Sequence, residues 1–166
     1  MKVHYLRTWH RACIEQTSKH MKVEGIQMNQ ATKILVIDDE EVVRLSYLRA
    51  LSGVSRKVEL VRNGKDALQL MGEHSFDVVL LDQRMPGMDG MEVLKAIKEK
   101  WPESEVIMIT GYPAIESAKE AVTLGAYDYL AKPIGPDDVV HAADGAMMHK
   151  KWMLRCDQQA QHAAVH

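Results

Sequence analysis

The stretch ILVIDDE, residues 34–40, joins four consecutive apolar residues to three consecutive acidic ones. Short apolar runs of this kind are typical of parallel strands covered on both faces, because neither face meets water. Glu41 to Leu51 follows at once with apolar residues at helical spacing, and Gly53 ends the pattern. The segment therefore predicts a buried strand, an acidic turn and a helix.

The same alternation recurs four times along the chain. Further strands are predicted at 57–61, 76–81, 106–109 and 126–130, each followed by a helical pattern, and the last helix opens at Pro136 and can continue past Trp152. Alternating strands and helices build βαβ units with right-handed crossovers. The predicted fold class is therefore α/β, a doubly wound five-stranded parallel sheet with five flanking helices.

Polar residues stand where the predicted strands end. Open parallel sheets bind ligands outside the carboxyl ends of their strands, so these residues are the candidates for function. Carboxylates held close together repel one another, and such a cluster usually holds a hard cation such as Mg²⁺. A hydroxyl and an ammonium beside them fit phosphate oxygens. The set consists of Asp38, Asp39, Asp82, Thr110 and Lys132.

This combination predicts phosphoryl transfer to a carboxylate, with a nucleophile, a metal and a cationic partner. Each residue also has an ordinary structural interpretation. A single Asp after a strand commonly caps the next helix, a single Thr commonly sits in a turn, and a single Lys is commonly solvated. Their joint placement at the ends of several strands of one sheet favours the chemical interpretation.

The composition limits the class of protein, its partners and its compartment. The 166 residues are 46% hydrophobic and 27% charged, with a net charge of −2, which fits one soluble domain with some end material. We therefore expect no direct nucleic-acid partner and no membrane partner. Cys13 and Cys156 lack metal-type spacing, which favours a reduced, cytoplasmic setting. We predict a flexible N-terminal extension at 1–30, one folded domain at 31–150, and a helical extension or tail at 151–166.

Four motifs in order, ILVIDDE, VVLLDQRMPGMDG, MITGYP and YDYLAKP, resemble the receiver domain of bacterial two-component response regulators. The resemblance covers about 70% of the chain, from Lys33 to Met147. It is greatest to receivers of the nitrogen-regulation type. It implies a flavodoxin-like sheet of order 2-1-3-4-5.

The resemblance also assigns roles to individual residues. Asp82 would be the phosphoacceptor, with Thr110 and Lys132 completing the catalytic set. Mg²⁺ would be held by Asp38, Asp39, Asp82 and the backbone carbonyl of Arg84, with Asp39 the more direct ligand of the acidic pair. Tyr129 would be the aromatic switch residue that follows Thr110, and Lys132-Pro133 would be a cis peptide. Arg84 and Tyr112 would modulate dephosphorylation.

The implied partners are proteins. A sensor histidine kinase or phosphotransfer protein would supply the phosphoryl group. A downstream protein would bind the face made by the fourth helix (115–125), the fifth strand (126–130) and the fifth helix (from 136). A homodimer is left open. The chain would catalyse only its own phosphotransfer and autodephosphorylation, and would not be an enzyme otherwise.

Two alternatives remain at this stage. Few residues follow Met147, which favours a single-domain regulator over a receiver cut from a larger transcriptional regulator. The second alternative is a hydrolase of the haloacid-dehalogenase type, which also uses an aspartyl nucleophile with Mg²⁺. Such enzymes place the nucleophile after the first strand and an Asp two residues later. Here Asp82 ends the third strand and Arg84 stands two residues later, which argues against a proton-shuttling acid.

Overall fold

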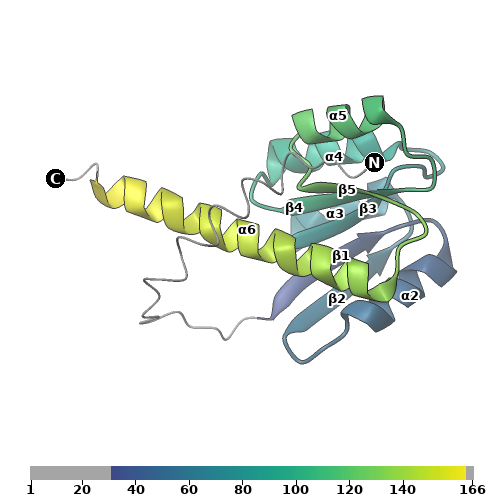
Figure 1. The fold of residues 1–166 in the computed structure, drawn as a ribbon, viewed down its shortest axis with the longest axis horizontal. Helices are drawn as coiled ribbons and strands as arrows, with labels where there is room; N and C mark the ends of the chain where they lie inside the picture. Colours follow the sequence, from purple (N-terminus) through teal and green to yellow (C-terminus); the bar gives the residue numbers. More distant parts are fainter. Residues whose placement is uncertain (1–30, 164–166) are drawn as a thin grey trace. The chain divides into compact units, whose positions relative to one another are not determined.

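The computed structural model describes residues 31–163, with side chains through Cys156. The predictions for residues 1–30 lie outside this part. A single parallel sheet has the strand order β2-β1-β3-β4-β5, which confirms the predicted fold class (Figure 1). Its strands are β1 (Thr32–Ile37), β2 (Arg56–Val61), β3 (Val78–Asp82), β4 (Glu105–Thr110) and β5 (Asp128–Ala131).

Helices cover both faces of the sheet. Three of them pack on one face: α3 (Gly64–Glu73), α4 (Gly90–Lys100) and α5 (Ile115–Thr123). The other face is covered by α2 (Glu41–Leu51) and α6 (Pro136–Ala163). Each crossover helix therefore lies where a βαβ unit requires it.

The apolar runs of the sequence are explained by this double cover. In β1, Leu35 and Ile37 join the core beneath α3 and α4, whereas Ile34 and Val36 join the core beneath α2 and α6. Both sets are at most 1% exposed. Because successive side chains of a strand point to opposite faces, a strand with two buried faces has no polar alternation.

The third and fifth strands begin later than predicted. The Asp77 side chain accepts a hydrogen bond from the backbone N–H of Lys33, and the regular ladder of β3 starts at Val78 opposite Ile34. At β5 the backbone N–H of Ala126 donates to the carbonyl of Ala121 and so belongs to the end of α5. Both strands therefore start two residues later than the apolar pattern indicates.

The last helix, α6, continues to Ala163, beyond the edge of the sheet (Figure 1). His149 Nδ1 lies 2.8 Å from Glu105 Oε1, and Lys150 Nζ lies 2.8 Å from Asp77 Oδ1. These contacts fasten the helix to the amino ends of β4 and β3. After them Trp152 is 48% exposed, so the helix here leaves the core.

None of the helices in the described part of the chain is both long enough and apolar enough to cross a membrane.

Candidate functional site

The predicted site residues meet at the carboxyl edge of the sheet. Asp82 ends β3 and Thr110 ends β4, while Asp38 and Lys132 each follow their strand by one residue. The strands β1, β3, β4 and β5 are neighbours in that order, so these four positions are adjacent. The residues Asp38, Asp82 and Thr110 are at most 5% exposed. The topology thus brings together residues that lie up to 94 positions apart.

Lys132 holds the two buried carboxylates together. Its Nζ lies 2.8 Å from Asp38 Oδ2 and 2.8 Å from Asp82 Oδ1. Glu40 Oε1 lies farther away, at 3.9 Å, and is exposed to solvent. Two carboxylates that share one ammonium in a desolvated place leave an excess of negative charge.

The pKa values of the site follow from this arrangement. Burial raises the pKa of the Asp82 carboxyl, and the hydrogen bond from Lys132 opposes part of that rise. Burial by itself would lower the pKa of Lys132, but hydrogen bonds to Asp38 and Asp82 outweigh it and raise the pKa. These contacts favour the charged form of Lys132, whereas loss of hydration disfavours the charged form of Asp82.

The acidic turn after β1 is fixed by a residue that sequence reasoning missed. Arg44 of α2 donates from Nη1 to the carbonyls of Asp38 and Asp39, at 2.6 and 2.9 Å. The backbone N–H of Glu40 donates to Asp38 Oδ1 at 2.8 Å. The sequence signal for this contact was an arginine in the first turn of the next helix. That signal is not specific, because many exposed arginines occupy such positions.

The residues predicted to hold a metal differ in where their side chains lie. Asp38 and Asp82 converge on Lys132, but Asp39 is exposed. Among residues 31–156, no three acidic, His or Cys side chains gather closely enough to share an ion. Mg²⁺ typically takes one or two protein carboxylates and keeps waters or phosphate oxygens as its other ligands. Two buried carboxylates with excess negative charge fit that oxygen-only chemistry.

The loop after β3 holds Asp82 from the main chain. The backbone N–H of Arg84 donates to Asp82 Oδ2 at 3.0 Å. Gly90, the first residue of α4, donates its N–H to the carbonyl of Gln83 at 2.8 Å. A side chain at Gly90 would collide with the backbone of Asp82 and Gln83, so the loop closes only on glycine. A capping box between Asp89 and Glu92 then starts α4.

Thr110 is fully buried, and its Oγ1 accepts a hydrogen bond from the backbone N–H of Tyr112 at 3.1 Å. Tyr112 itself is exposed, and the Arg84 guanidinium lies over its ring. The two residues predicted to modulate dephosphorylation are therefore in contact with each other, across the loops that follow β3 and β4.

Tyr129, the predicted switch residue, is half-buried on β5. Its hydroxyl donates to Gln83 Oε1 at 2.8 Å. Gln83 was missed by sequence reasoning, since nothing in the sequence pairs it with a residue 46 positions later. Lys132-Pro133 is a cis peptide, as predicted.

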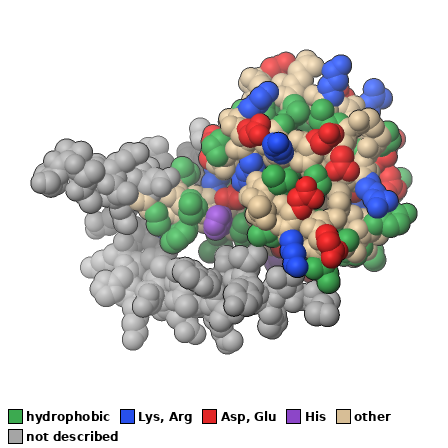
Figure 2. Space-filling model, turned by 90° about the horizontal axis from the view of Figure 1, so that it is seen from above, with side chains coloured by type: hydrophobic (Ala, Val, Ile, Leu, Met, Phe, Trp, Pro, Cys, Tyr) green, Lys and Arg blue, Asp and Glu red, His purple; other side chains and the backbone are tan. Residues whose placement is uncertain are grey.

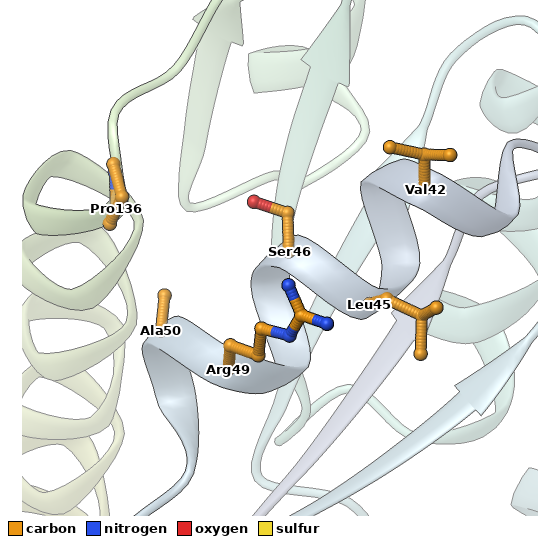
Figure 3. Close-up of a pocket in the computed structure, with 6 residues that line it drawn as sticks. All are labelled: Val42, Leu45, Ser46, Arg49, Ala50 and Pro136. Carbon is orange, nitrogen blue, oxygen red and sulfur yellow. The ribbon is translucent and has the colours of Figure 1, made fainter.

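An open groove lies beside this edge, between α2 and the first residue of α6 (Figure 3). Val42, Leu45, Ser46, Arg49 and Ala50 line it along α2, and Pro136 faces them. Of these six residues only Arg49 is charged, so the groove differs in chemistry from the acidic edge where Asp82 lies.

Residues 34–144 match the family model described as the response regulator receiver domain. The chain belongs to the response regulator receiver family. It is therefore a receiver of two-component systems, and such receivers are generally signalling domains rather than enzymes. Phosphorylation and Mg²⁺ binding are typical of this family. The four motifs on which the sequence resemblance rested lie within this match or at its boundaries.

Curated relatives are longer than this receiver. The chain is 37% identical over 116 residues to the DNA-binding transcriptional regulator NtrC of Escherichia coli K12, covering 70% of the chain and 25% of that protein. It is 40% identical over 114 residues to the regulatory protein AtoC of the same organism, covering 68% of the chain and 24% of AtoC. The chain thus spans about a quarter of these relatives, and the receiver is NtrC-like.

Solved structures agree with this assignment. A CheY-like receiver from Methanospirillum hungatei superimposes with a TM-score of 0.72 at 25% identity, covering 75% of this chain and 99% of that one. NtrX from Brucella abortus gives a TM-score of 0.73 at 31% identity, covering 78% of this chain and 30% of NtrX.

Proposed function

We propose that this receiver accepts a phosphoryl group on Asp82 from a phosphohistidine of a sensor kinase or phosphotransfer protein. The observation that carries the proposal is the contact of Lys132 Nζ with both Asp38 and Asp82, each at 2.8 Å. An ammonium held beside a buried carboxylate at a strand end can pair with the phosphoryl oxygens that arrive there. This contact supports a role for Asp82 as an acceptor rather than as a helix cap.

The chemical step is a displacement at phosphorus. A carboxylate oxygen of Asp82 forms a bond to phosphorus while the phosphorus–nitrogen bond of the donor breaks, and the leaving imidazole takes up a proton. Lys132 stabilises the charge on the phosphoryl oxygens, and the backbone N–H of Arg84, now 3.0 Å from Asp82 Oδ2, orients the carboxylate. The same site would release the group by hydrolysis, so its activity is limited to its own phosphorylation and dephosphorylation.

Mg²⁺ is the cofactor that fits this donor set. Asp38, Asp39, Asp82 and the carbonyl of Arg84 would hold it, and Asp39 would turn its exposed carboxylate toward the ion. When bound, the ion supplies charge neutralisation between the carboxylates and an anionic donor. Lys132 alone provides one positive charge against two buried carboxylates, which supports the need for a cation.

The output face is proposed to be α5, β5 and α6. Thr110 immediately precedes the loop to α5, and Tyr129 lies on β5, so both can transmit a change at Asp82 to this side. Ile115 and Val122 of α5 are 65% and 50% exposed, which gives a protein partner apolar surface. The view in Figure 2 mixes acidic, basic and hydrophobic side chains without a continuous basic stripe, which suits a protein partner.

We propose three segments for this chain. Residues 31–150 would be the receiver, 1–30 an N-terminal extension and 151–166 a C-terminal extension. Both a receiver that acts alone through protein contacts and a receiver within a longer transcriptional regulator are compatible with a chain that spans a quarter of its relatives.

The test is phosphorylation by a small donor. Incubation with acetyl phosphate and Mg²⁺ is expected to add one phosphoryl group by intact mass, and EDTA is expected to prevent it. Asp82→Asn should add none, whereas Asp77→Asn, which changes a carboxylate near the opposite end of β3, should add one as the wild type does. Full labelling of Asp82→Asn would overturn the assignment.

A further inference from the structure

Gln83 has its main chain and its side chain fixed by three hydrogen bonds. Its N–H donates to the carbonyl of Ile109 on β4, and its carbonyl accepts from Gly90, both at 2.8 Å. Its Oε1 accepts from the Tyr129 hydroxyl, also at 2.8 Å, and the residue is only 9% exposed. The residue that follows the acceptor is therefore bound to β4, to α4 and to β5.

This arrangement gives Tyr129 a partner that Thr110 does not provide. Thr110 Oγ1 accepts from the N–H of Tyr112, within its own loop. The Tyr129 hydroxyl, in contrast, is attached to a residue joined to Asp82 by one peptide bond. A displacement of the Asp82 main chain must move Gln83. The hydrogen bond then transmits this movement to the Tyr129 side chain.

We propose that Gln83 is a positioning residue for Tyr129, and that their hydrogen bond carries a change at Asp82 directly to β5. This inference rests on the proposed phosphorylation of Asp82. A neutral intramolecular hydrogen bond typically contributes about 0.5–1.5 kcal/mol, which corresponds to about a 2- to 10-fold bias between two arrangements. Loss of the acceptor also leaves a half-buried hydroxyl without this partner, so the bond resists breaking.

The first test needs no phosphorylation. In protein labelled with 3-fluorotyrosine, Tyr129→Phe identifies the ¹⁹F signal of Tyr129, and Gln83→Met removes the acceptor oxygen with little change in side-chain length. Gln83→Met is expected to shift that signal, and Gln83→Glu, which keeps an acceptor oxygen, to restore most of its position. An unchanged Tyr129 signal in Gln83→Met would overturn the proposal.

Tyr127→Phe supplies the matched control. Tyr127 belongs to the core on the opposite face of the sheet, and its ring packs against His149 at 5.4 Å between centroids. The signal of Tyr127, identified by this variant, should not respond to Gln83→Met. An equal shift of both tyrosine signals would show a general disturbance of the fold and would overturn the specific role of Gln83.

The second test measures transmission. Amide exchange of residues 115–131 is compared before and after labelling with acetyl phosphate, with labelling checked by mass. Gln83→Met and Tyr129→Phe are each expected to reduce the phosphorylation-induced change about 2- to 10-fold, and the double variant to reduce it no further. Additive losses, or a full response in Gln83→Met, would overturn the proposal. If the wild type takes no phosphoryl group, the proposed function fails, while the ¹⁹F shift still decides whether Gln83 positions Tyr129.

Discussion

The guanidinium of Arg84 lies over the ring of Tyr112, with its carbon 4.4 Å from the ring centroid. The two residues stand two positions beyond Asp82 and two positions beyond Thr110, so the contact connects the loops on either side of the acceptor. A cation over an aromatic face at this distance contributes about 0.5–1 kcal/mol when exposed. We propose that the two side chains together cover the approach of water to the carboxylate of Asp82.

This cover predicts a long-lived phosphorylated state. Hydrolysis needs a water in line with the phosphorus–oxygen bond, and small misplacements of a reactant can cost about 10²-fold in rate. Arg84→Ala and Tyr112→Ala are each expected to release phosphate faster than the wild type. Because each variant removes the same contact, the double variant should be little faster than the quicker single one. Release rates of labelled protein measure this, and equal rates in all four proteins would reject shielding.

A second prediction concerns the glycine that starts α4. A methyl group at Gly90 would meet the carbonyl oxygen of Asp82 and would lie 2.7 Å from the Cα of Gln83. Gly90→Ala is expected to lower the free energy of unfolding by about 1–3 kcal/mol, as overpacking does elsewhere, and to slow labelling of Asp82. Urea denaturation and labelling rate by mass are the measurements.

Gly72→Ala is the control for that substitution. Gly72 lies in α3 with nothing within 4 Å of the added carbon, so alanine should be neutral or stabilising there. If Gly90→Ala were as stable and as reactive as Gly72→Ala, the close packing of the loop against the acceptor would have no functional consequence.

The sheet and the site could be predicted because both depend on short-range patterns. Apolar runs mark strands covered on both faces, and parallel topology brings the strand ends to one edge, so Asp38, Asp82, Thr110 and Lys132 were identified as neighbours. The pairing of Gln83 with Tyr129 could not be predicted, because it depends on side-chain conformations across two strands.

The same limit applies to the contacts that fix the acidic turn and the last helix. Arg44 donates to two main-chain carbonyls. Every residue has such a carbonyl, so the sequence does not indicate which ones an arginine will bind. The His149–Glu105 contact joins residues 44 positions apart and depends on the direction in which α6 leaves its loop. Helical spacing could mark the start of α6, but Trp152, Met153 and Leu154 are exposed, so no core pattern indicated how far the helix continues.

The third prediction separates the chemistry from its readout. Thr110→Val keeps the buried shape of a fully covered side chain but removes the hydroxyl. The variant loses one member of the predicted catalytic set, so it is expected to accept a phosphoryl group more slowly, but Asp82 and Lys132 are unchanged and labelling should still occur. Amide exchange on α5 and β5, however, should respond less to labelling than in the wild type. The proposed output face would be contradicted if this variant responded as strongly as the wild type. It would also be contradicted if the response of the wild-type protein were confined to the loop after Asp82.

The fourth prediction concerns the N-terminal extension. A chain that starts at Met28 keeps all the strands and the whole carboxyl edge. It is expected to unfold at the same urea concentration as the full chain, and to take a phosphoryl group at the same rate. Loss of stability on truncation would instead show that residues 1–27 pack on the receiver.

The last prediction follows from the desolvation of Asp82. Burial raises the pKa of this carboxyl above its ordinary value of 3.8, so the folded chain binds the proton more tightly than the unfolded chain. Stability therefore falls as the pH rises from the pKa of this carboxyl in the unfolded chain to its raised pKa in the folded chain. The cost of ionisation is fully present at neutral pH. In EDTA, Asp82→Asn is expected to be more stable than the wild type at pH 7, and the difference should shrink as the pH falls toward about 3.8.

Asp39→Asn, at an exposed carboxylate, should show no comparable gain. Urea denaturation at several pH values measures both. A less stable Asp82→Asn at pH 7 would mean that attraction to Lys132 outweighs the lost hydration.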